Sequence, residues 1–383
     1  MSAHITLSLG LTASLLIVSS LVVLPSNAQR VVATVAVGSS PGAIAYDSGM
    51  GEVFVAKDLG LGNVSIISDA TNSVVAELRV GAYPSGLAYD SGKGEVFVVL
   101  ANDNHIPVIS DTMNRIVANV TVSNVISGLL AAAYDSTKGE IYVTWEGGTV
   151  IVVSDTTKSV VKSIEVGGHP VSLAYDQAKD EMFVVNLDGF VSVISDSTYD
   201  IVARVQVGNE PQAAVYDPGK AEIFVTNSYS NSVSIISDSN DSVIHTVNVA
   251  SYPQGIAFDS SRGEVFVTHY LNNSVSVISD ATNQVLSSVA VGSNPTDAAY
   301  DSAKGEVFVS NLGGDTISVI SDSFVTGGRT GGQTTTRTLQ TNAPGEVSYQ
   351  LLAISLTTVL LTVWSAFRLR RGSRARMEGE GGP

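Results

Sequence analysis

The fold is decided by a stretch that reads Pro253-Gln-Gly-Ile-Ala-Phe-Asp-Ser-Ser-Arg-Gly-Glu-Val-Phe-Val-Thr-His269, followed by Ser274-Val-Ser-Val-Ile278 and Gln284-Val-Leu-Ser-Ser-Val-Ala-Val291. It is rich in β-branched residues, and no helical period appears in it. We predict four short strands, at 254–258, 264–268, 274–278 and 284–291, because Asp, Gly and Asn punctuate the segments between them.

This unit recurs along the chain. One marker, Ala-Tyr-Asp or a close variant, ends at Asp47, Asp90, Asp135, Asp176, Asp217, Asp259 and Asp301. A second marker, Ser-Asp, ends at Asp69, Asp111, Asp155, Asp196, Asp238, Asp280 and Asp322. Seven copies of a four-stranded unit of about 42 residues are typical of an all-β fold, a seven-bladed β-propeller of four-stranded antiparallel blades.

The ends of the repeat array predict how the ring closes. The segment Val31–Val37 matches the fourth strand of a unit, whereas the array stops at Asp322, after a third strand. We therefore expect the N-terminal strand to complete the seventh blade, in a propeller domain that covers residues 31–323. Closure of this kind removes the stacking faces that an open array would have to cap.

The flanking segments carry membrane signals. Residues 347–367 contain no charge and would span about 32 Å as a helix, so they predict a C-terminal transmembrane helix. Five arginines after Phe367 mark residues 368–383 as a basic cytoplasmic tail. Residues 1–28 read as a signal peptide, with an uncleaved anchor as the alternative, and residues 324–346 as a Gly/Thr-rich stalk. We expect a single-pass protein of the plasma membrane with an extracellular propeller.

Composition excludes several functions. The chain has 36 acidic against 20 basic side chains, a net charge of -16 and no cysteine. Disulfide scaffolds, thiol chemistry and cysteine-ligated zinc are thereby excluded, and nucleic acid is not an expected partner because an acidic surface repels phosphate.

Four segments carry a family resemblance, because second strands end as Phe183-Val-Val-Asn186, Phe224-Val-Thr-Asn227, Phe266-Val-Thr-His269 and Phe308-Val-Ser-Asn311. With a Gly-x-x-Pro turn before the first strand, they resemble the YVTN-type β-propeller repeat over residues 31–322. The resemblance implies an archaeal-type cell-surface or surface-layer protein. The same repeat resembles the blades of several extracellular lyases and lactonases, so it is weak on function.

Comparison of the seven copies separates two faces. The turns between first and second strands and between third and fourth strands barely change, and we call the side that carries them the uniform face. The other two loop sets differ from copy to copy, and strand alternation places both on the opposite side, the variable face. Loops on a rigid scaffold commonly carry binding groups, so the predicted binding rim consists of Tyr83, His169, Glu210, Tyr252, His269 and Asn294.

Five of these residues precede the first strand of a unit and are expected to ring the mouth of the central channel. Histidine, carboxylate and amide groups there could bind a metal or act as acid and base, or they could be solvated turn residues. The repeated aspartates favour Asx turns over calcium ligation. No catalytic residue, protein metal site or cofactor is assigned from the sequence.

Sequons give candidate glycosylation sites at Asn63, Asn119, Asn240 and Asn272, of which Asn63 and Asn272 are expected in variable-face loops.

The leading hypothesis is a non-enzymatic, membrane-anchored surface module that binds other surface proteins, glycans or copies of itself. The alternative is an extracellular lyase or lactonase-like hydrolase with a divalent metal in the central funnel.

Overall fold

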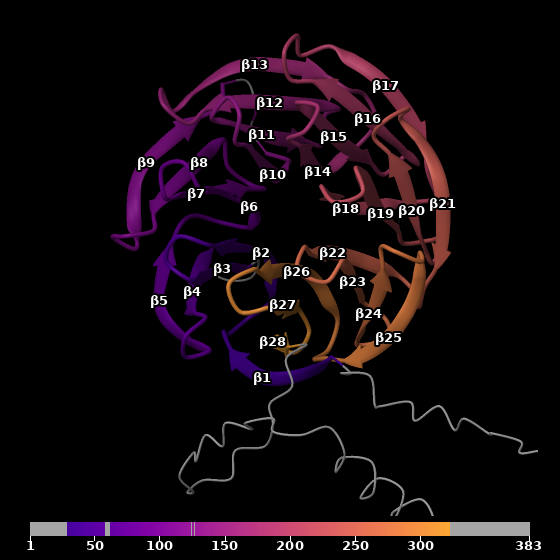
Figure 1. The fold of residues 1–383 in the computed structure, drawn as a ribbon. Helices are drawn as coiled ribbons and strands as arrows, with labels where there is room; N and C mark the ends of the chain where they lie inside the picture. Colours follow the sequence, from indigo (N-terminus) through magenta and orange to yellow (C-terminus); the bar gives the residue numbers. More distant parts are fainter. Residues whose placement is uncertain (1–28, 58–61, 124, 126, 322–383) are drawn as a thin grey trace, which may run out of the picture. The chain divides into compact units, whose positions relative to one another are not determined.

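The computed structural model describes residues 29–57, 62–123, 125 and 127–321, and every regular element in them is a β-strand. These strands form seven four-stranded sheets arranged as blades around a ring (Figure 1). The propeller belongs to the first of two compact units, Met1–Phe324, and the second unit, Val325–Pro383, lies outside the described residues.

The strands have four roles. The innermost strands are β2 (Pro41–Asp47), β6 (Pro84–Asp90), β10 (Leu129–Asp135), β14 (Pro170–Asp176), β18 (Pro211–Asp217), β22 (Pro253–Asp259) and β26 (Pro295–Asp301). The second strands are β3 (Glu52–Lys57), β7 (Glu95–Leu100), β11 (Glu140–Trp145), β15 (Glu181–Asn186), β19 (Glu222–Asn227), β23 (Glu264–His269) and β27 (Glu306–Asn311). The third strands are β4 (Asn63–Ser68), β8 (His105–Ser110), β12 (Thr149–Ser154), β16 (Phe190–Ser195), β20 (Ser232–Ser237), β24 (Ser274–Ser279) and β28 (Thr316–Ser321). The outermost strands are β1 (Arg30–Ala36), β5 (Ser73–Arg79), β9 (Arg115–Thr121), β13 (Ser159–Glu165), β17 (Ile201–Gln206), β21 (Ser242–Asn248) and β25 (Gln284–Ala290).

The core lies between the blades. Second and third strands are buried on both faces, which explains why they read as nearly continuous apolar runs. A large aromatic side chain is fully buried at the same place in each second strand, namely Phe54, Phe97, Tyr142, Phe183, Phe224, Phe266 and Phe308. Phe54, for example, packs with Leu87, Val96 and Val98 of the next blade. Each blade therefore buries its apolar faces only when both neighbours are present.

The predicted closure is confirmed. Strand β1 pairs antiparallel with β28, from Arg30 opposite Ser321 to Ala36 opposite Thr316, and the last sheet has the order β1-β28-β27-β26. Both ends of the propeller sequence thus share one blade, at the lower edge of the ring in Figure 1.

The marker aspartates that end the innermost strands form Asx turns on the uniform face. Asp47 is fully buried, and its Oδ1 accepts hydrogen bonds from the backbone N–H groups of Gly49 (2.7 Å) and Met50 (3.1 Å). The other copies repeat this pattern, for example Asp176 with Ala178 and Lys179. The aspartates therefore stabilise the first turn of each blade, as predicted from their positions.

Lysines on the uniform face connect neighbouring blades. Nζ of Lys93 lies 2.8 Å from an oxygen of Asp155 in the next blade, and Lys138 makes the equivalent 2.9 Å pair with Asp196. Lys304 reaches Asp69 of the first blade at 3.2 Å, across the closure. The repeated turns thus fix the blades to one another.

Tyrosines of the innermost strands face the seams between blades. Burial raises the pKa of these phenols, and the marker aspartate of the preceding blade raises it further. The tyrosines concerned are Tyr89, Tyr134, Tyr175 and Tyr216. In the sixth blade Phe258 stands at this position, so that seam has no phenol opposite Asp217.

Several predictions lie outside the described residues: the signal peptide, the stalk, the transmembrane helix at 347–367 and the basic tail. Within the described part of the chain, no helix has the length and apolar character needed to cross a membrane.

Candidate binding face and central channel

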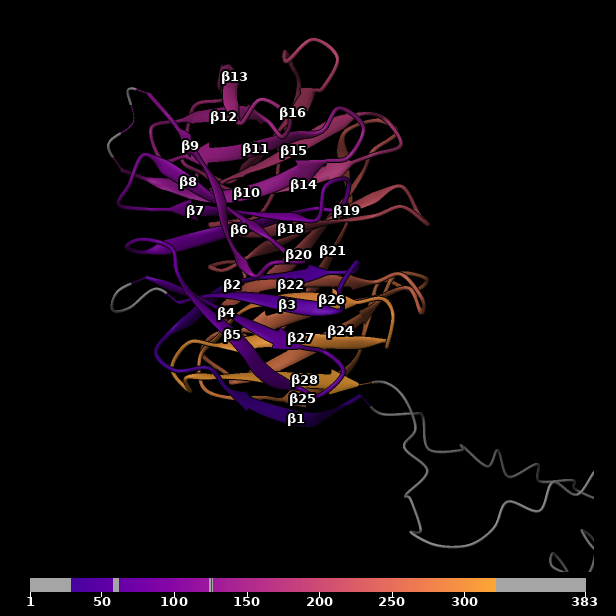
Figure 2. The same ribbon diagram turned by 90° about the vertical axis from the view of Figure 1, so that its left-hand side faces the viewer.

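The two loop sets of the variable face are joined by backbone hydrogen bonds. The carbonyl of the residue before the innermost strand accepts from the first loop residue after the second strand: Ala101 to Tyr83 (2.8 Å), Leu187 to His169 (3.0 Å), Ser228 to Glu210 (2.9 Å), Tyr270 to Tyr252 (3.1 Å) and Leu312 to Asn294 (3.0 Å). Both sets therefore share one side of the propeller, as strand alternation predicts, and the loops project from the two faces in side view (Figure 2).

The pre-proline residues are held in an unusual backbone conformation. Tyr83, Glu210, Tyr252 and Asn294 have φ values of 57°, 47°, 57° and 51°, in the left-handed region. Asparagine tolerates this region, but tyrosine and glutamate occupy it at a cost of about 1–3 kcal/mol. In the fourth blade, Gly167 and Gly168 take the positive φ values ahead of His169.

The structure places five of the six predicted rim residues at the surface of this face. Tyr83 is 47% exposed, His169 is exposed, and Glu210, Tyr252 and Asn294 are half-buried. Nδ1 of His169 lies 3.5 Å from Oδ1 of Asp188 in the neighbouring loop. The binding role of these residues stays a prediction.

The sixth, His269, was wrongly predicted to lie on the rim. It is fully buried at the end of β23, where its Nε2 lies 2.8 Å from Oγ of Ser276, and burial lowers its pKa to about 4. Asn227, at the same position of the previous blade, is also fully buried and donates to Ser234 Oγ at 3.0 Å. In these two blades the last residue of the second strand is therefore structural, because its side chain bonds inside its own blade.

The candidate glycosylation sites lie in different environments. Asn240 and Asn272 are exposed in turns, and Asn119 is exposed in β9. Asn63 was expected in a loop but is the half-buried first residue of β4, where its Nδ2 donates to Glu77. Pairing with both β3 and β5 explains the difference.

A central channel runs between the innermost strands and encloses about 450 Å³. Its wall consists of residues one to three positions after the first residue of each innermost strand, together with Leu312. The pre-proline residues predicted for its mouth are not among these wall residues, and their place at the mouth stays a prediction. Apolar Leu130 and Val171 lie on some blades, and Gln212, Gln254 and Thr296 lie on others. The innermost strands surround the opening in Figure 1.

Asp297 is the one ionisable side chain among the described residues that line this channel. Its Oδ2 accepts a 3.1 Å hydrogen bond from the backbone N–H of Ile44 in the first blade, and its Oδ1 accepts one of 2.9 Å from Ala298. Burial raises the pKa of Asp297 to about 7, although the two backbone donors oppose the shift. The carboxyl therefore changes charge near neutral pH.

Sequence reasoning missed Asp297, yet the internal comparison contained a signal for it. At this position the other copies have Ala43, Gly86, Ala131, Ser172, Ala213 and Gly255. Small residues are needed because adjacent strands approach closely: a Cβ built on Gly255 would lie 2.4 Å from Cα of Asp297. A lone aspartate in such a series departs from the repeat.

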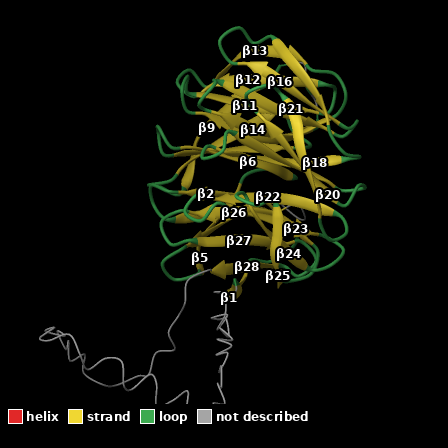
Figure 3. Ribbon diagram, turned by 45° about the vertical axis from the view of Figure 1, so that its right-hand side comes forward, coloured by secondary structure: helices red, strands yellow, loops and turns green. Residues whose placement is uncertain are grey.

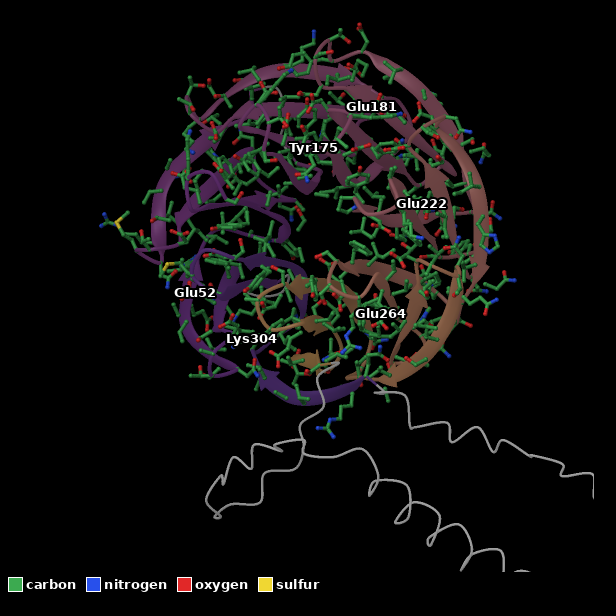
Figure 4. All side chains as sticks on the ribbon, viewed as in Figure 1. Glu52, Tyr175, Glu181, Glu222, Glu264 and Lys304 are labelled. Atoms are coloured by element: carbon green, nitrogen blue, oxygen red, sulfur yellow. The ribbon has the colours of Figure 1, made fainter. Side chains whose placement is uncertain are left out.

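A second acidic group lies on the uniform face. One oxygen from each of Asp135, Glu140 and Asp196 fall within 4.8 Å of one another. Lys138 already pairs with Asp196 there, and Tyr142 donates to it at 2.9 Å. Glu140 is the first residue of a second strand, and a glutamate stands at the same place in other blades, including Glu52, Glu181, Glu222 and Glu264, which Figure 4 labels. This cluster therefore belongs to the repeated seam between blades.

Comparisons with known proteins establish the fold. No family model and no curated protein sequence matches the chain. Among solved structures, hydrazine synthase from Kuenenia stuttgartiensis is similar with a TM-score of 0.67 and 14% identity, covering 74% of this chain and 96% of that one. The β-propeller domain of Cps50 (Swd1) from Myceliophteria thermophila is similar with a TM-score of 0.66 and 10% identity, covering 77% and 99%. At such identities the likeness shows a seven-bladed β-propeller and no particular function.

Proposed function

We propose that this protein is a non-enzymatic binding module that engages its partner through the variable face. The contrast between the two faces is the observation that carries the proposal. On the uniform face, carboxylates and lysines are occupied by Asx turns and by ion pairs between blades. On the variable face, non-repeating side chains such as Tyr83, Tyr229 and Leu271 are 47%, 62% and 63% exposed. The loops of both faces are green in Figure 3.

The proposal places the module at the cell surface. The uncharged segment 347–367 with its following arginines supports single-pass anchoring, and the resemblance to YVTN-type repeats supports an extracellular propeller. Protease added to intact cells is expected to remove the propeller, whereas an epitope added after Arg376 stays protected. An epitope that is accessible from outside contradicts this topology.

Crosslinking on intact cells, followed by mass spectrometry of the captured partners, tests the binding role. The combined substitutions His169→Ala, Glu210→Gln and Tyr252→Ala are expected to abolish specific capture. The matched control is Ser91→Ala, Ser260→Ala and Ser302→Ala, three exposed uniform-face residues at one repeat position. Equal capture by both variants, each with an unchanged melting temperature, contradicts the assignment of the face.

The metal-dependent lyase or lactonase alternative has its own test. Asp297 is the one ionisable group among the described channel-lining residues, and a catalytic metal usually needs about three protein ligands. The alternative requires stoichiometric divalent metal in the purified protein and a lower melting temperature in chelator. We expect neither result.

A further inference from the structure

Three tyrosines form a cluster on the variable face, across the seam between the fifth and sixth blades. Tyr229 follows β19, Tyr252 precedes β22 and Tyr270 follows β23. The ring centroids of Tyr229 and Tyr252 are 5.8 Å apart, and those of Tyr252 and Tyr270 are 6.0 Å apart, with interplanar angles of 50° and 55°. Tyr252 is therefore the centre of a continuous aromatic surface.

This surface is open to solvent. Tyr229 is 62% exposed, Tyr252 and Tyr270 are half-buried, and the adjacent Leu271 is 63% exposed. Exposed aromatic rings grouped together are unusual on a soluble surface, because each leaves apolar area in water. Such a group is typical of a recognition site.

The cluster is held in place by its backbone. The N–H of Tyr252 donates to Oδ1 of Asn231 at 2.9 Å, and its carbonyl accepts from Tyr270 at 3.1 Å. Tyr252 keeps a φ of 57°, a conformation that Asn294 adopts more easily at the same repeat position. A bulky ring is thus retained where the backbone favours a smaller residue, and its orientation is fixed before any ligand arrives.

The surroundings favour a neutral, hydroxyl-rich ligand. Asn209 and Asn272 are exposed beside the tyrosines, and Glu210 precedes the innermost strand of the fifth blade. Burial raises the pKa of Tyr252, and the neighbouring Tyr229 and Glu210 raise it further, so the phenol stays protonated. Amides and a carboxylate can bind sugar hydroxyls, and the ring faces can stack on the C–H face of a sugar. The region 31–346 has 34 acidic against 14 basic residues, which disfavours anionic polymers.

We propose that Tyr229, Tyr252 and Tyr270 form a stacking platform for a neutral oligosaccharide. The inference rests on the proposed function, because it names the ligand class that this part of the variable face takes. The tyrosines supply the stacking area, and Asn209 and Glu210 supply hydrogen bonds at its border.

The test uses the full-length protein and named probes. Mannotriose, cellotetraose and chitotriose serve as neutral probes, and a polygalacturonate oligomer serves as the anionic one, with affinity measured by calorimetry. At least one neutral probe is expected to bind, and the anionic probe is not. Replacing Tyr229 and Tyr270 together by alanine should weaken that binding about tenfold or more, because two of the three stacking rings are lost.

The chain offers matched controls. Met113, in a turn of the uniform face, is an apolar side chain that is 49% exposed and lies outside the variable face and the cluster. Met113→Ala should therefore leave sugar binding unchanged. The double variant Tyr229→Phe with Tyr270→Phe keeps the rings and should bind within about threefold of the original protein, which separates stacking from a folding defect.

Three results overturn the inference: no neutral probe binds, the anionic probe binds better, or Met113→Ala weakens binding as much as the double alanine variant. These outcomes are distinct from failure of the proposed function. If the double alanine variant still captures its partner on cells, and the rim variant does not, the variable face binds something other than a neutral sugar.

Discussion

Replacing Asp297 by asparagine should change how stability depends on pH. The pKa of Asp297 is raised to about 7 in the channel, against an ordinary value of 3.8. The folded state therefore holds a proton that the unfolded chain has lost between about pH 4 and pH 7. Stability from this group is fully present below pH 4 and is lost as pH rises through 7. Asparagine has a similar shape and no charge, so it avoids this loss.

The magnitude follows from the shift. About three pKa units at about 1.4 kcal/mol each give about 4 kcal/mol as an upper value at pH 8. About 2.5 kcal/mol of this should develop between pH 5 and pH 8, a range that avoids the isoelectric point near 4.6. The difference in unfolding free energy between Asp297→Asn and the original protein should grow by that amount, in favour of the variant.

Urea denaturation followed by circular dichroism at pH 5, 6, 7 and 8 measures this difference. Titration of the other carboxylates is common to both proteins and cancels. Glu165→Gln, an exposed change in β13, is the control and should give a difference that stays within about 0.5 kcal/mol at every pH. Parallel stability curves for Asp297→Asn and the original protein would refute the reasoning, because the channel carboxyl would then be charged throughout.

Three further predictions concern the ring. Deleting residues 31–37 leaves β28 with one open edge and exposes Ile317 and Val319, so the protein should lose cooperative melting or form aggregates that light scattering detects. An unchanged melting curve would contradict closure by β1. Phe258→Tyr restores a phenol opposite Asp217 and should raise the unfolding free energy measured in urea by about 0.5–1.5 kcal/mol, whereas Tyr175→Phe loses a 2.8 Å bond to Thr137 and should lower it. Two changes of the same sign would contradict a stabilising role for the phenol. Lys93→Met introduces the residue found at the same position of the first blade, Met50, and should lower the unfolding free energy by about 1 kcal/mol at low salt and by less at 1 M NaCl. A loss of stability that does not depend on salt would exclude the ion pair with Asp155 as its source.

The blade architecture could be predicted because seven copies repeat the same physical constraints. In the sixth copy, the predicted strand 264–268 differs from β23 (Glu264–His269) by one residue, since the Gly turn and the apolar run fix its ends. The closure could be predicted because a fourth strand precedes the first complete unit and the last unit lacks one.

Candidate site residues were harder to predict, because the chain sequence does not say which side chains point inward. His269 follows Phe-Val-Thr and looks like the start of a loop, but it pairs with Ser274 and its ring bonds inside the blade. Asp297 lies in a strand that otherwise reads as a repeat element, and its place in the channel wall, with its cross-blade bond to Ile44, is seen only in the folded ring. The Asp297 contact joins segments that are distant in the sequence, whereas His269 bonds to the adjacent strand of its own hairpin.

Closure by β1 also has a consequence for the order of folding. Strand β1 is synthesised first, yet its partner β28 is the last strand of the ring to be made. Blades one to six can form from local hairpins, but the seventh must wait until β28 has been made, since contacts between residues so far apart form late. During that interval β28 has a free edge that another chain could occupy, with Ile317 and Val319 beside it. The rate at which the two ends meet thus competes with association between unfinished copies, and lower protein concentration should favour the closed ring.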